Sequence, residues 1–245
     1  MKILVCISIV PDTTTKITFT DDNTKFNTNG VNYIINPYDE LSLTRALELT
    51  ETLGGEVTVI NVGLADAEPS IRKALAIGAQ AAVRINAMPS DAVFVAEQIA
   101  AYAKNKNYDV IFTGRESIDF NGGLVGGLLA GMLQVPLMNI ATKVDVEGNS
   151  VHAVVDIDGG KETLFANLPV VVSAQKELSE PRIPNMRGIM QSRTKPLTVV
   201  EPTNNSGFNR WAKFELPKEK GSCKMISPEQ AGDLIQLLHQ EAKII

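Results

Sequence analysis

The sequence predicts an α/β protein with a doubly wound, mostly parallel sheet. Two observations carry this prediction. Short apolar runs alternate with amphipathic segments over residues 1–135, which is typical of right-handed βαβ crossovers with helices on both faces of a parallel sheet. Beyond Pro136 the pattern changes to short alternating segments between glycine-containing turns, which indicates an antiparallel hairpin extension of the sheet.

The elements of the parallel part follow from these patterns. Apolar runs predict strands at 3–7, 56–62, 81–85, 109–113 and 169–173. Helical periodicity and capping signals predict helices at 37–53, 70–77, 91–104 and 122–134. The first helix begins with Asn36 as N-cap and Pro37 at the first helical position. A polar stretch at 13–32 predicts an excursion or short hairpin.

The rest of the chain shows three further patterns. Alternating segments at 142–146, 151–156 and 162–167 predict an antiparallel meander. Residues 180–202 have no regular period and predict an irregular, basic segment. A capping-box pattern at Ser227–Gln230 predicts a terminal helix. We therefore divide the chain into a main domain, residues 1–200, and a C-terminal arm, residues 201–245.

Composition and charge exclude several classes of protein. The net charge of −5 argues against a nucleic-acid partner, although residues 181–200 hold four basic residues and no acidic one. No apolar run approaches the length of a membrane span, and the N-terminus runs directly into a predicted strand. Two cysteines and two histidines are too few for a disulfide framework or a zinc cluster. We expect no metal site and a reducing compartment, the bacterial cytoplasm or the mitochondrial matrix of a eukaryote.

Catalytic motifs such as GxSxG, HExxH and CxxC do not occur in the sequence. His152 falls on a predicted hairpin and His239 on the terminal helix, where surface or packing roles explain both. Cys6, at the end of the first strand, is a candidate nucleophile, but a buried cysteine acting as a small hydrophobe is the commoner case.

Ligands of doubly wound sheets bind where parallel strands end and helices begin. The segments expected there are residues 6–12, 36–39, 62–64 and 114–125. The richest is the glycine-containing run from Gly114 to Gly126, whose backbone amides could cradle a phosphate. It matches neither GxGxxG nor GxxxxGK[ST], and glycines that merely let a helix approach the sheet would explain it too. The residues alone thus point to a nucleotide-binding α/β protein.

Taken together, several blocks of the sequence resemble the β (small) subunit of electron transfer flavoprotein. These blocks are Asn36-Pro37-Tyr38-Asp39-Glu40, Ile71–Ala79, Gly114–Pro136, Asp158–Val171 and Glu180–Pro196. The resemblance covers essentially the whole chain. It implies an adenine nucleotide alpha hydrolase-like fold and a heterodimer in which a larger α subunit holds the redox-active FAD. The β subunit buries a structural AMP and supplies part of the flavin's surroundings, so it is not a self-sufficient catalyst.

The resemblance also assigns cofactor-binding residues by position. They are Cys6, Asn36, Pro37, Tyr38, Asp39, Val62, Gly114, Arg115, Glu116, Ser117, Ile118, Asp119, Asn121, Gly122, Gly123, Leu124 and Val125. The amides near residues 121–125 would hold the AMP phosphate at a helix N-terminus. Tyr38 and Thr13 would approach the flavin from the β side.

One departure from the family bears on which nucleotide is bound. Family members that bifurcate electrons bind a second FAD in place of AMP and resemble Asp-Gly-Asp-Thr-Ala-Gln-Val-Gly-Pro. The run from Asp119 to Gly127 lacks the second acid, the threonine, the glutamine and the final proline. We therefore expect AMP, with a second FAD as the alternative. A free-standing universal-stress-like or ATP-pyrophosphatase-like protein and an enzyme using Cys6 are two further alternatives.

Partners also follow from the resemblance. Acyl-CoA or other flavin dehydrogenases would donate electrons, a quinone oxidoreductase would accept them, and the arm would dock on the α subunit. Met186 falls where the family places a leucine that inserts into partner dehydrogenases, in a recognition loop at about 182–197 with Arg187 and Ile189. Folding of Met186 back onto its own domain is the alternative. Glu162 matches a family glutamate that pairs with an arginine of the α subunit, and a solvated hairpin charge is its alternative.

Overall fold

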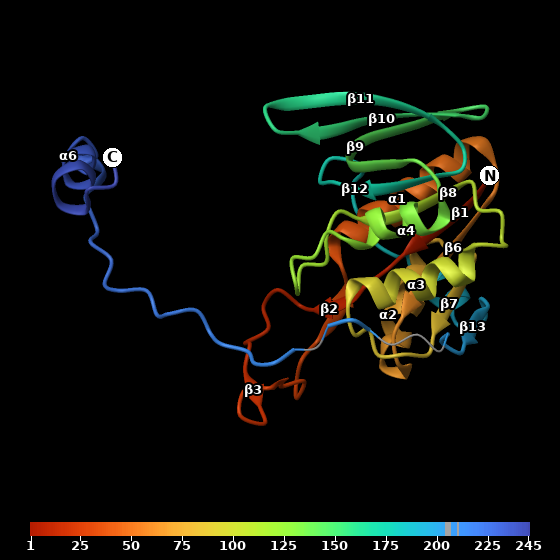
Figure 1. Ribbon diagram of the computed structural model, residues 1–245, viewed down its shortest axis with the longest axis horizontal. Coiled ribbons are helices and arrows are strands. Elements are labelled where there is room, and N and C mark those ends of the chain that lie inside the picture. The colour runs from red at the N-terminus through yellow and green to blue at the C-terminus, as the bar shows by residue number, and fades with distance from the viewer. Residues whose placement is uncertain (204–206, 210) are drawn as a thin grey trace.

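A nine-stranded sheet runs through the computed structural model, which describes residues 1–203, 207–209 and 211–245 (Figure 1). The strand order is β11-β10-β9-β12-β8-β1-β6-β7-β13. The strands are β1 (Lys2–Cys6), β6 (Glu56–Val62), β7 (Ala81–Ile85), β8 (Val110–Gly114), β9 (Leu137–Glu147), β10 (Ser150–Ile157), β11 (Gly160–Asn167), β12 (Val170–Ala174) and β13 (Leu197–Val200). The predicted α/β fold with a mostly parallel sheet is confirmed.

β1 lies in the middle of the sheet, and the strands that follow it lie on both of its sides. β6 and β7 lie on one side and β8 and β12 on the other, all parallel to their neighbours. The strand order therefore reverses between β1 and β8, where Val5 pairs with Phe112. A reversal of this kind opens a crevice at the carboxyl ends of the two strands, because the connections that follow them run to opposite faces of the sheet.

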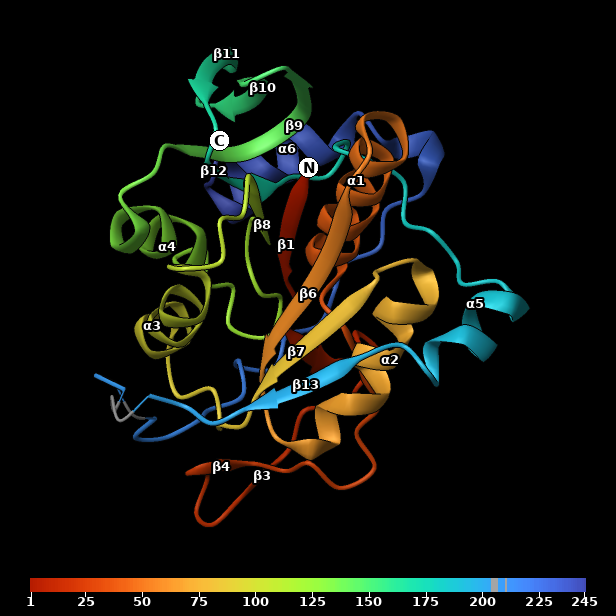
Figure 2. The same cartoon turned by 90° about the vertical axis from the view of Figure 1, so that its right-hand side faces the viewer.

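Helices cover both faces of the sheet (Figure 2). The helices α1 (Pro37–Leu53) and α2 (Glu68–Ile77) cover one face, and α3 (Ala92–Ala103) and α4 (Val125–Leu133) cover the other. Val5 of β1 packs in the core that contains Leu43 and Ile71, whereas Leu4 packs in the core that contains Leu129. β1 is apolar after Lys2 because both of its faces are buried.

The polar stretch after β1 forms the short hairpin that its sequence predicts. β2 (Ile9–Pro11) pairs with β5 (Tyr33–Ile35), and between them β3 (Phe19–Thr20) pairs with β4 (Lys25–Phe26). This excursion projects from the main domain beneath the carboxyl end of β1 in Figure 1.

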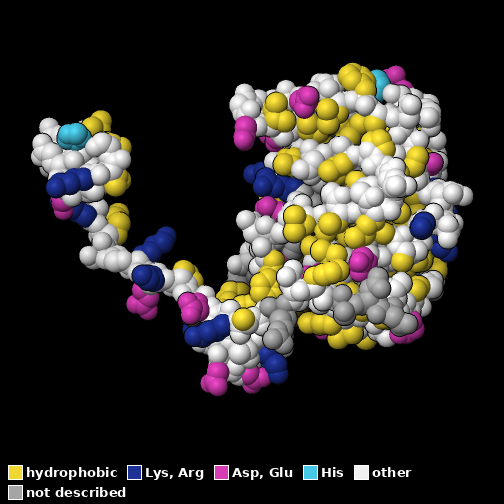
Figure 3. Space-filling view, viewed as in Figure 1, with side chains coloured by type: hydrophobic (Ala, Val, Ile, Leu, Met, Phe, Trp, Pro, Cys, Tyr) yellow, Lys and Arg dark blue, Asp and Glu magenta, His cyan; other side chains and the backbone are white. Residues whose placement is uncertain are grey.

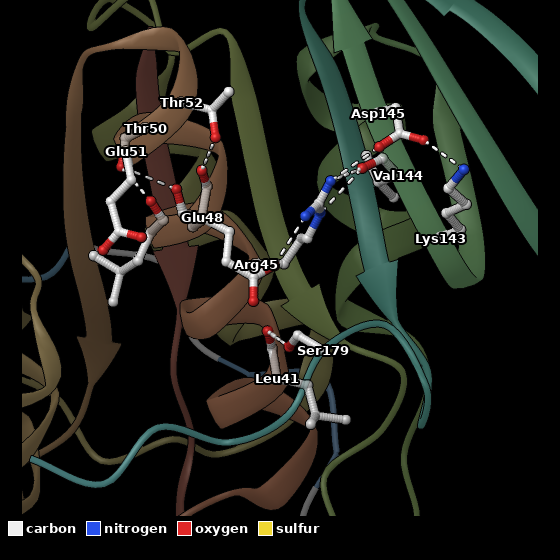
Figure 4. A network of polar contacts seen from close by, with 12 residues as sticks. Leu41, Arg45, Glu48, Thr50, Glu51, Thr52, Lys143, Val144, Asp145 and Ser179 are labelled. Carbon is white, nitrogen blue, oxygen red and sulfur yellow. Dashed lines mark hydrogen bonds and ion pairs between the residues drawn. The ribbon is translucent and has the colours of Figure 1, made fainter.

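The antiparallel extension is also confirmed, but its first strand is longer than predicted. β9 runs parallel to β12 at its start and antiparallel to β10 further on. Arg45 of α1 fixes this strand to the helical layer, because its Nε and Nη2 donate to the carbonyl of Val144 at 3.0 and 2.6 Å (Figure 4). Its guanidinium also contacts the carboxylates of Glu48 and Asp145.

The prediction of an irregular segment at 180–202 is wrong. The segment contains the helix α5 (Met186–Ser192) and the strand β13, which pairs in parallel with β7. Asn185 caps α5 by accepting a hydrogen bond from Gly188 N at 2.8 Å. Arg72 of α2 donates to the carbonyls of Ser192 and Lys195, both at 2.7 Å. Both elements are short and depend on contacts with α2 and β7, so the local sequence pattern alone does not reveal them.

The C-terminal arm passes beside β3, leaves the main domain there and ends in a small helical segment (Figure 1). This helical segment comprises η2 (Pro228–Gln230), α6 (Asp233–Leu237) and the π-helical turn η3 (Leu238–Ala242). The terminal helix is thus a single turn, and Ser227 provides no side-chain cap in the described chain. Residues 204–206 and 210 of the predicted arm lie outside the described residues. Among the described residues, no helix is long and apolar enough to cross a membrane.

Candidate nucleotide site

The carboxyl ends of β1 and β8 are joined through one buried carboxylate. Asp39, near the start of α1, accepts hydrogen bonds from Ser8 N through Oδ2 at 2.7 Å and from Gly114 N through Oδ1 at 2.8 Å. Its side chain lies where the strand order reverses, between the turn after β1 and the turn after β8. A Cβ at position 114 would collide with this carboxylate and with Tyr38, so glycine is required there. Asp39 therefore holds both turns of the crevice in place.

The environment of Asp39 affects its protonation. Asp39 is 3% exposed, and this burial raises the pKa of its carboxyl to about 7, against the opposing effect of the N–H donors from Ser8 and Gly114. The carboxyl of Asp39 therefore changes its charge at a pH closer to neutrality than an ordinary aspartate does.

Asn36 holds the middle of the loop after β8. Its Nδ2 donates to the carbonyl of Glu116 at 2.8 Å, and its Oδ1 accepts from Ile118 N at 3.3 Å. Asn36 stands at the N-cap position of α1, but its side chain makes no capping hydrogen bond in the described structure. The predicted capping role is therefore wrong, because this amide is used to bind the loop instead.

The loop from Gly114 to Val125, which we call the 114–125 loop, is folded back on itself. Ser117 N donates to the carbonyl of Gly122 at 3.2 Å, and Asn121 has a positive φ of 52°. This bridge delays the helix, so α4 begins at Val125 and the predicted start at Gly122 is wrong. Leu124 is the N-cap of α4, and no side chain in the described part of the chain caps it. The first amides of α4 are thus available to an anion.

Tyr38 and Arg115 form the polar rim of the loop on the α1 side. The guanidinium of Arg115 lies 5.7 Å from the centre of the Tyr38 ring. Its Nη2 lies 3.3 Å from Glu116 Oε2, and its backbone N donates to the carbonyl of Ala174. These contacts give the half-buried Tyr38 a fixed position beside Gly114.

Cys6 and Val62 lie at the ends of adjacent strands and pack in the core beneath α3 and α4. Burial raises the pKa of the Cys6 thiol well above its ordinary range, and the nearby Asp39 raises it further. A thiol that stays protonated is a poor nucleophile. The structure therefore favours Cys6 as a small buried hydrophobe over the alternative of an enzyme that uses it.

Two polar atoms that the sequence interpretation missed are buried at the same edge of the sheet. Asn61 Oδ1, in β6, and Thr113 Oγ1, in β8, have no hydrogen-bond partner among the described residues. Asn61 donates through Nδ2 to the carbonyl of Ile7 at 2.8 Å. This bond fixes the orientation of its amide and leaves Oδ1 without a donor among the described residues. Thr113 Oγ1 lies against Gly126 in the first turn of α4. The only signal for either in the sequence is a polar residue near the end of an apolar strand.

The predicted partner-binding residues lie away from this crevice and apart from one another. Met186, Arg187 and Ile189 are exposed or half-exposed on α5, which packs beside α2 near the β13 end of the sheet (Figure 2). Glu162 is exposed on β11, at the opposite edge of the same sheet, and forms no ion pair within the described residues. The structure thus places the residues predicted to bind a cofactor at one edge of the sheet, apart from the two surfaces predicted to bind partners.

The basic residues of the 181–200 segment do not all belong to a docking surface. Lys195 Nζ donates to the carbonyls of Leu75 and Ala79 at 2.8 and 2.7 Å, at the C-terminal end of α2, and burial lowers the pKa of this amine. Arg182 forms a two-pronged ion pair with Glu51 at 2.6 and 2.8 Å. Arg187 and Arg193 remain exposed.

The fold and the crevice define the class of this protein. It is a doubly wound α/β protein with a glycine-containing loop at its topological switch point, and the helix after that loop has no side-chain cap in the described structure. Within the described residues, no group of three or more His, Cys, Asp or Glu side chains is placed to hold a metal ion. The family described as "Electron transfer flavoprotein domain" matches residues 23–205. The chain belongs to the electron transfer flavoprotein family.

Named relatives in this family are similar to the chain over most or all of its length. The chain is 34% identical over 259 aligned positions to the electron transfer flavoprotein subunit beta of Bacillus subtilis, with 100% of both chains covered. It is 33% identical to the human subunit beta over 208 positions, with 82% of each chain covered. The subunit beta of Dictyostelium discoideum is 30% identical, with 100% of this chain and 99% of its own covered.

Proposed function

We propose that this chain is the β subunit of a heterodimeric electron transfer flavoprotein and that it binds AMP as a structural nucleotide in the crevice between β1 and β8. The observation that carries the proposal is the uncapped N-terminus of α4, which follows a loop that hydrogen bonds to Asp39 and Asn36 anchor. An AMP phosphate would accept hydrogen bonds from the amides of residues 123–126. Phosphate at this helix end is stabilised by the helix dipole as well as by the N–H groups.

The residues around the crevice fit an adenine nucleotide. The orphaned Asn61 Oδ1 is an acceptor for a ligand N–H, and the Thr113 hydroxyl lies against the first turn of α4, where the phosphate would be held. Leu124 and Gly123 carry no charged or amide side chain, so the phosphate would be held mainly by the main chain. This composition favours AMP over a second FAD, whose additional phosphate and flavin would need further polar partners.

The redox-active group would be an FAD held mainly by an α subunit. When bound, it supplies the electron transfer that the family name describes, and this chain contributes to its surroundings through Tyr38. Tyr38 is fixed by Arg115 and Gly114 near the mouth of the crevice. Thr13, in the turn after β2, is exposed, and its contact with a flavin would depend on the partner subunit.

Donors and acceptor would meet the heterodimer away from the AMP crevice. We assign dehydrogenase docking to α5 and the segment just before it. Met186 and Met190 of α5 are 75 and 70% exposed, and Ile183, which precedes the helix, is 92% exposed. The alternative, that Met186 folds back onto its own domain, is not favoured by this exposure. A quinone oxidoreductase is the proposed acceptor, and Glu162 on β11 is the proposed contact with the mobile part of the α subunit.

The division of labour between the two subunits can be tested by expression of this chain alone and together with an α subunit. The isolated chain should show no flavin absorbance, and the complex should show one reducible FAD. A reducible flavin bound tightly by the isolated chain would contradict the proposal. A stable homodimer that does not associate with an α subunit would favour the free-standing nucleotide-binding alternative.

A further inference from the structure

Four aromatic rings from three distant segments form one continuous row on the surface. Phe120, at the tip of the 114–125 loop, stacks on Trp211 of the arm, with ring centres 4.6 Å apart and planes 9° from parallel. Trp211 stacks on Phe214 at 5.8 Å, and Phe214 stacks on Phe19 of β3 at 5.1 Å. Phe120 and Trp211 are each 55% exposed, so the row covers the loop from outside.

The same stretch of the arm is fastened to the main domain on both sides of Trp211. Asp91 Oδ2 accepts hydrogen bonds from Phe208 N at 2.6 Å and from Asn209 N at 2.8 Å. Phe214 N donates to the carbonyl of Asn23 at 2.7 Å. Trp211 therefore belongs to a segment whose backbone is held by α3 on one side and by the β3–β4 hairpin on the other.

Beyond Phe214 the described hydrogen bonds and ion pairs of the arm are internal to it. In residues 215–245, the hydrogen bonds and ion pairs described in the structure join residues of the arm to one another, as between Lys224 and Glu241. Figure 3 shows this part standing away from the main domain, with hydrophobic side chains mostly on the side that faces the main domain. Trp211 thus lies between the 114–125 loop and the part of the arm that is free to bind a partner.

We infer that Trp211 is a positioning residue of the nucleotide site, and that its stack on Phe120 couples nucleotide binding to docking of the distal arm. The inference rests on the proposed function. Phe120 lies in the same loop, three residues before Gly123, the first of the amides that would face the phosphate. A ring held on Phe120 therefore reduces the conformational freedom of that stretch. Less freedom in the free loop means a smaller ordering cost when the nucleotide binds.

The coupling is reciprocal. If docking of the distal arm on the α subunit holds Trp211 on Phe120, docking strengthens nucleotide binding, and the nucleotide strengthens docking by the same factor. A stacked aromatic pair changes an equilibrium by about two- to tenfold, which sets the expected size of the effect.

The test uses the complete heterodimer and measures the rate at which bound AMP exchanges with isotopically labelled AMP. Trp211→Ala and Phe120→Leu should each speed exchange by about two- to tenfold, Trp211→Phe should restore the slow rate, and the double variant should be no faster than either single one. Phe208→Ala is the matched control, because Phe208 is an exposed aromatic of the same segment that lies outside the row. Thermal melting of each heterodimer checks that the fold is retained.

Two results would overturn the inference, and they differ in what else they affect. Exchange rates in Trp211→Ala and Phe120→Leu that equal those of the wild type and of Phe208→Ala would remove the coupling and leave the AMP assignment intact. A wild-type heterodimer that holds no AMP would contradict both the inference and the proposed function. Should Trp211→Ala fail to assemble, Phe120→Leu decides the question, because it leaves the arm unchanged.

Discussion

The carboxylate of Asp39 accepts a hydrogen bond from the backbone N–H of Gly114 at 2.8 Å, and this contact links the start of α1 to the end of β8. The other oxygen of the same carboxylate accepts from Ser8 N, just beyond β1. One side chain thus fixes the two turns between which the strand order reverses. A ligand bound there would meet a crevice already shaped by the fold.

Replacement of Asp39 by alanine should destabilise the protein. Two backbone N–H groups, of Ser8 and Gly114, would lose their acceptor, and each unsatisfied donor costs about 1–3 kcal/mol when water cannot replace the bond. We expect a loss of about 2–4 kcal/mol in the free energy of unfolding, measured by urea denaturation. Glu40→Ala, one residue further along α1, should cost less than about 1 kcal/mol. Equal losses in the two variants would contradict the role given to Asp39.

The free energy of unfolding should depend on pH through the titration of the Asp39 carboxyl group. Burial raises the pKa of Asp39 from its ordinary value of 3.8 to about 7, so the native state binds more protons than the unfolded state between these values. Its stabilising contribution is complete below the unfolded pKa and is lost as the pH rises through the folded pKa.

The comparison of wild type with Asp39→Asn isolates this effect, because the amide does not titrate. Between pH 5 and pH 7, the free energy of unfolding of the wild type should fall relative to that of the variant, by at most about 1.4 kcal/mol per pH unit. Above pH 8 the difference should be constant. Parallel curves over the whole range would show that Asp39 does not titrate as described.

Lys195 should contribute to stability, unlike the exposed Arg193 of the same segment. Its ammonium donates to the carbonyls that end α2, and Lys195→Met removes these bonds while keeping the apolar stem. We expect a loss of about 1–2 kcal/mol in unfolding free energy. Arg193→Met, at an exposed position two residues earlier, should stay within about 0.5 kcal/mol of the wild type. If Lys195→Met were as stable as the wild type, the structural role would be contradicted and Lys195 would be assigned to the docking surface.

Met186 should dominate dehydrogenase docking on α5. Met186→Ala should weaken the apparent affinity in steady-state electron transfer by roughly thirtyfold, or about 2 kcal/mol, because binding energy concentrates in apolar side chains that a partner buries. Met88, which is 70% exposed on a different part of the surface, offers a matched methionine control. Docking that is equally strong in Met186→Ala and Met88→Ala, with normal melting of both, would exclude the anchor role.

The sequence predicted the parallel framework because each strand and helix there has a local pattern. β1 is apolar after Lys2, and Asp91 precedes α3 as a side-chain cap that accepts from Phe94 N. The Asn36-Pro37 pair located the start of α1 correctly, but the function of the Asn36 amide depends on Glu116, which lies far along the chain. Local patterns predict where helices and strands lie in the sequence. They do not show which distant residue a side chain will bind.

Other parts of the fold and of the site depend on tertiary contacts and were missed. α5 and β13 are stabilised by Arg72 and by pairing with β7, neither of which a short window of sequence contains. The stack of Phe120 on Trp211 joins the 114–125 loop to the arm, and its only trace in the sequence is that Trp211 is the sole tryptophan of the chain. Such contacts follow from the assembled fold.

The most direct measurement of the central claim is the nucleotide content of the purified heterodimer, determined by acid extraction, chromatography and mass spectrometry. The account predicts one AMP and one FAD per heterodimer, and loss of the AMP alone when Asp39→Ala releases the two turns of the crevice. Two FAD and no AMP would contradict the assignment of AMP to the crevice between β1 and β8.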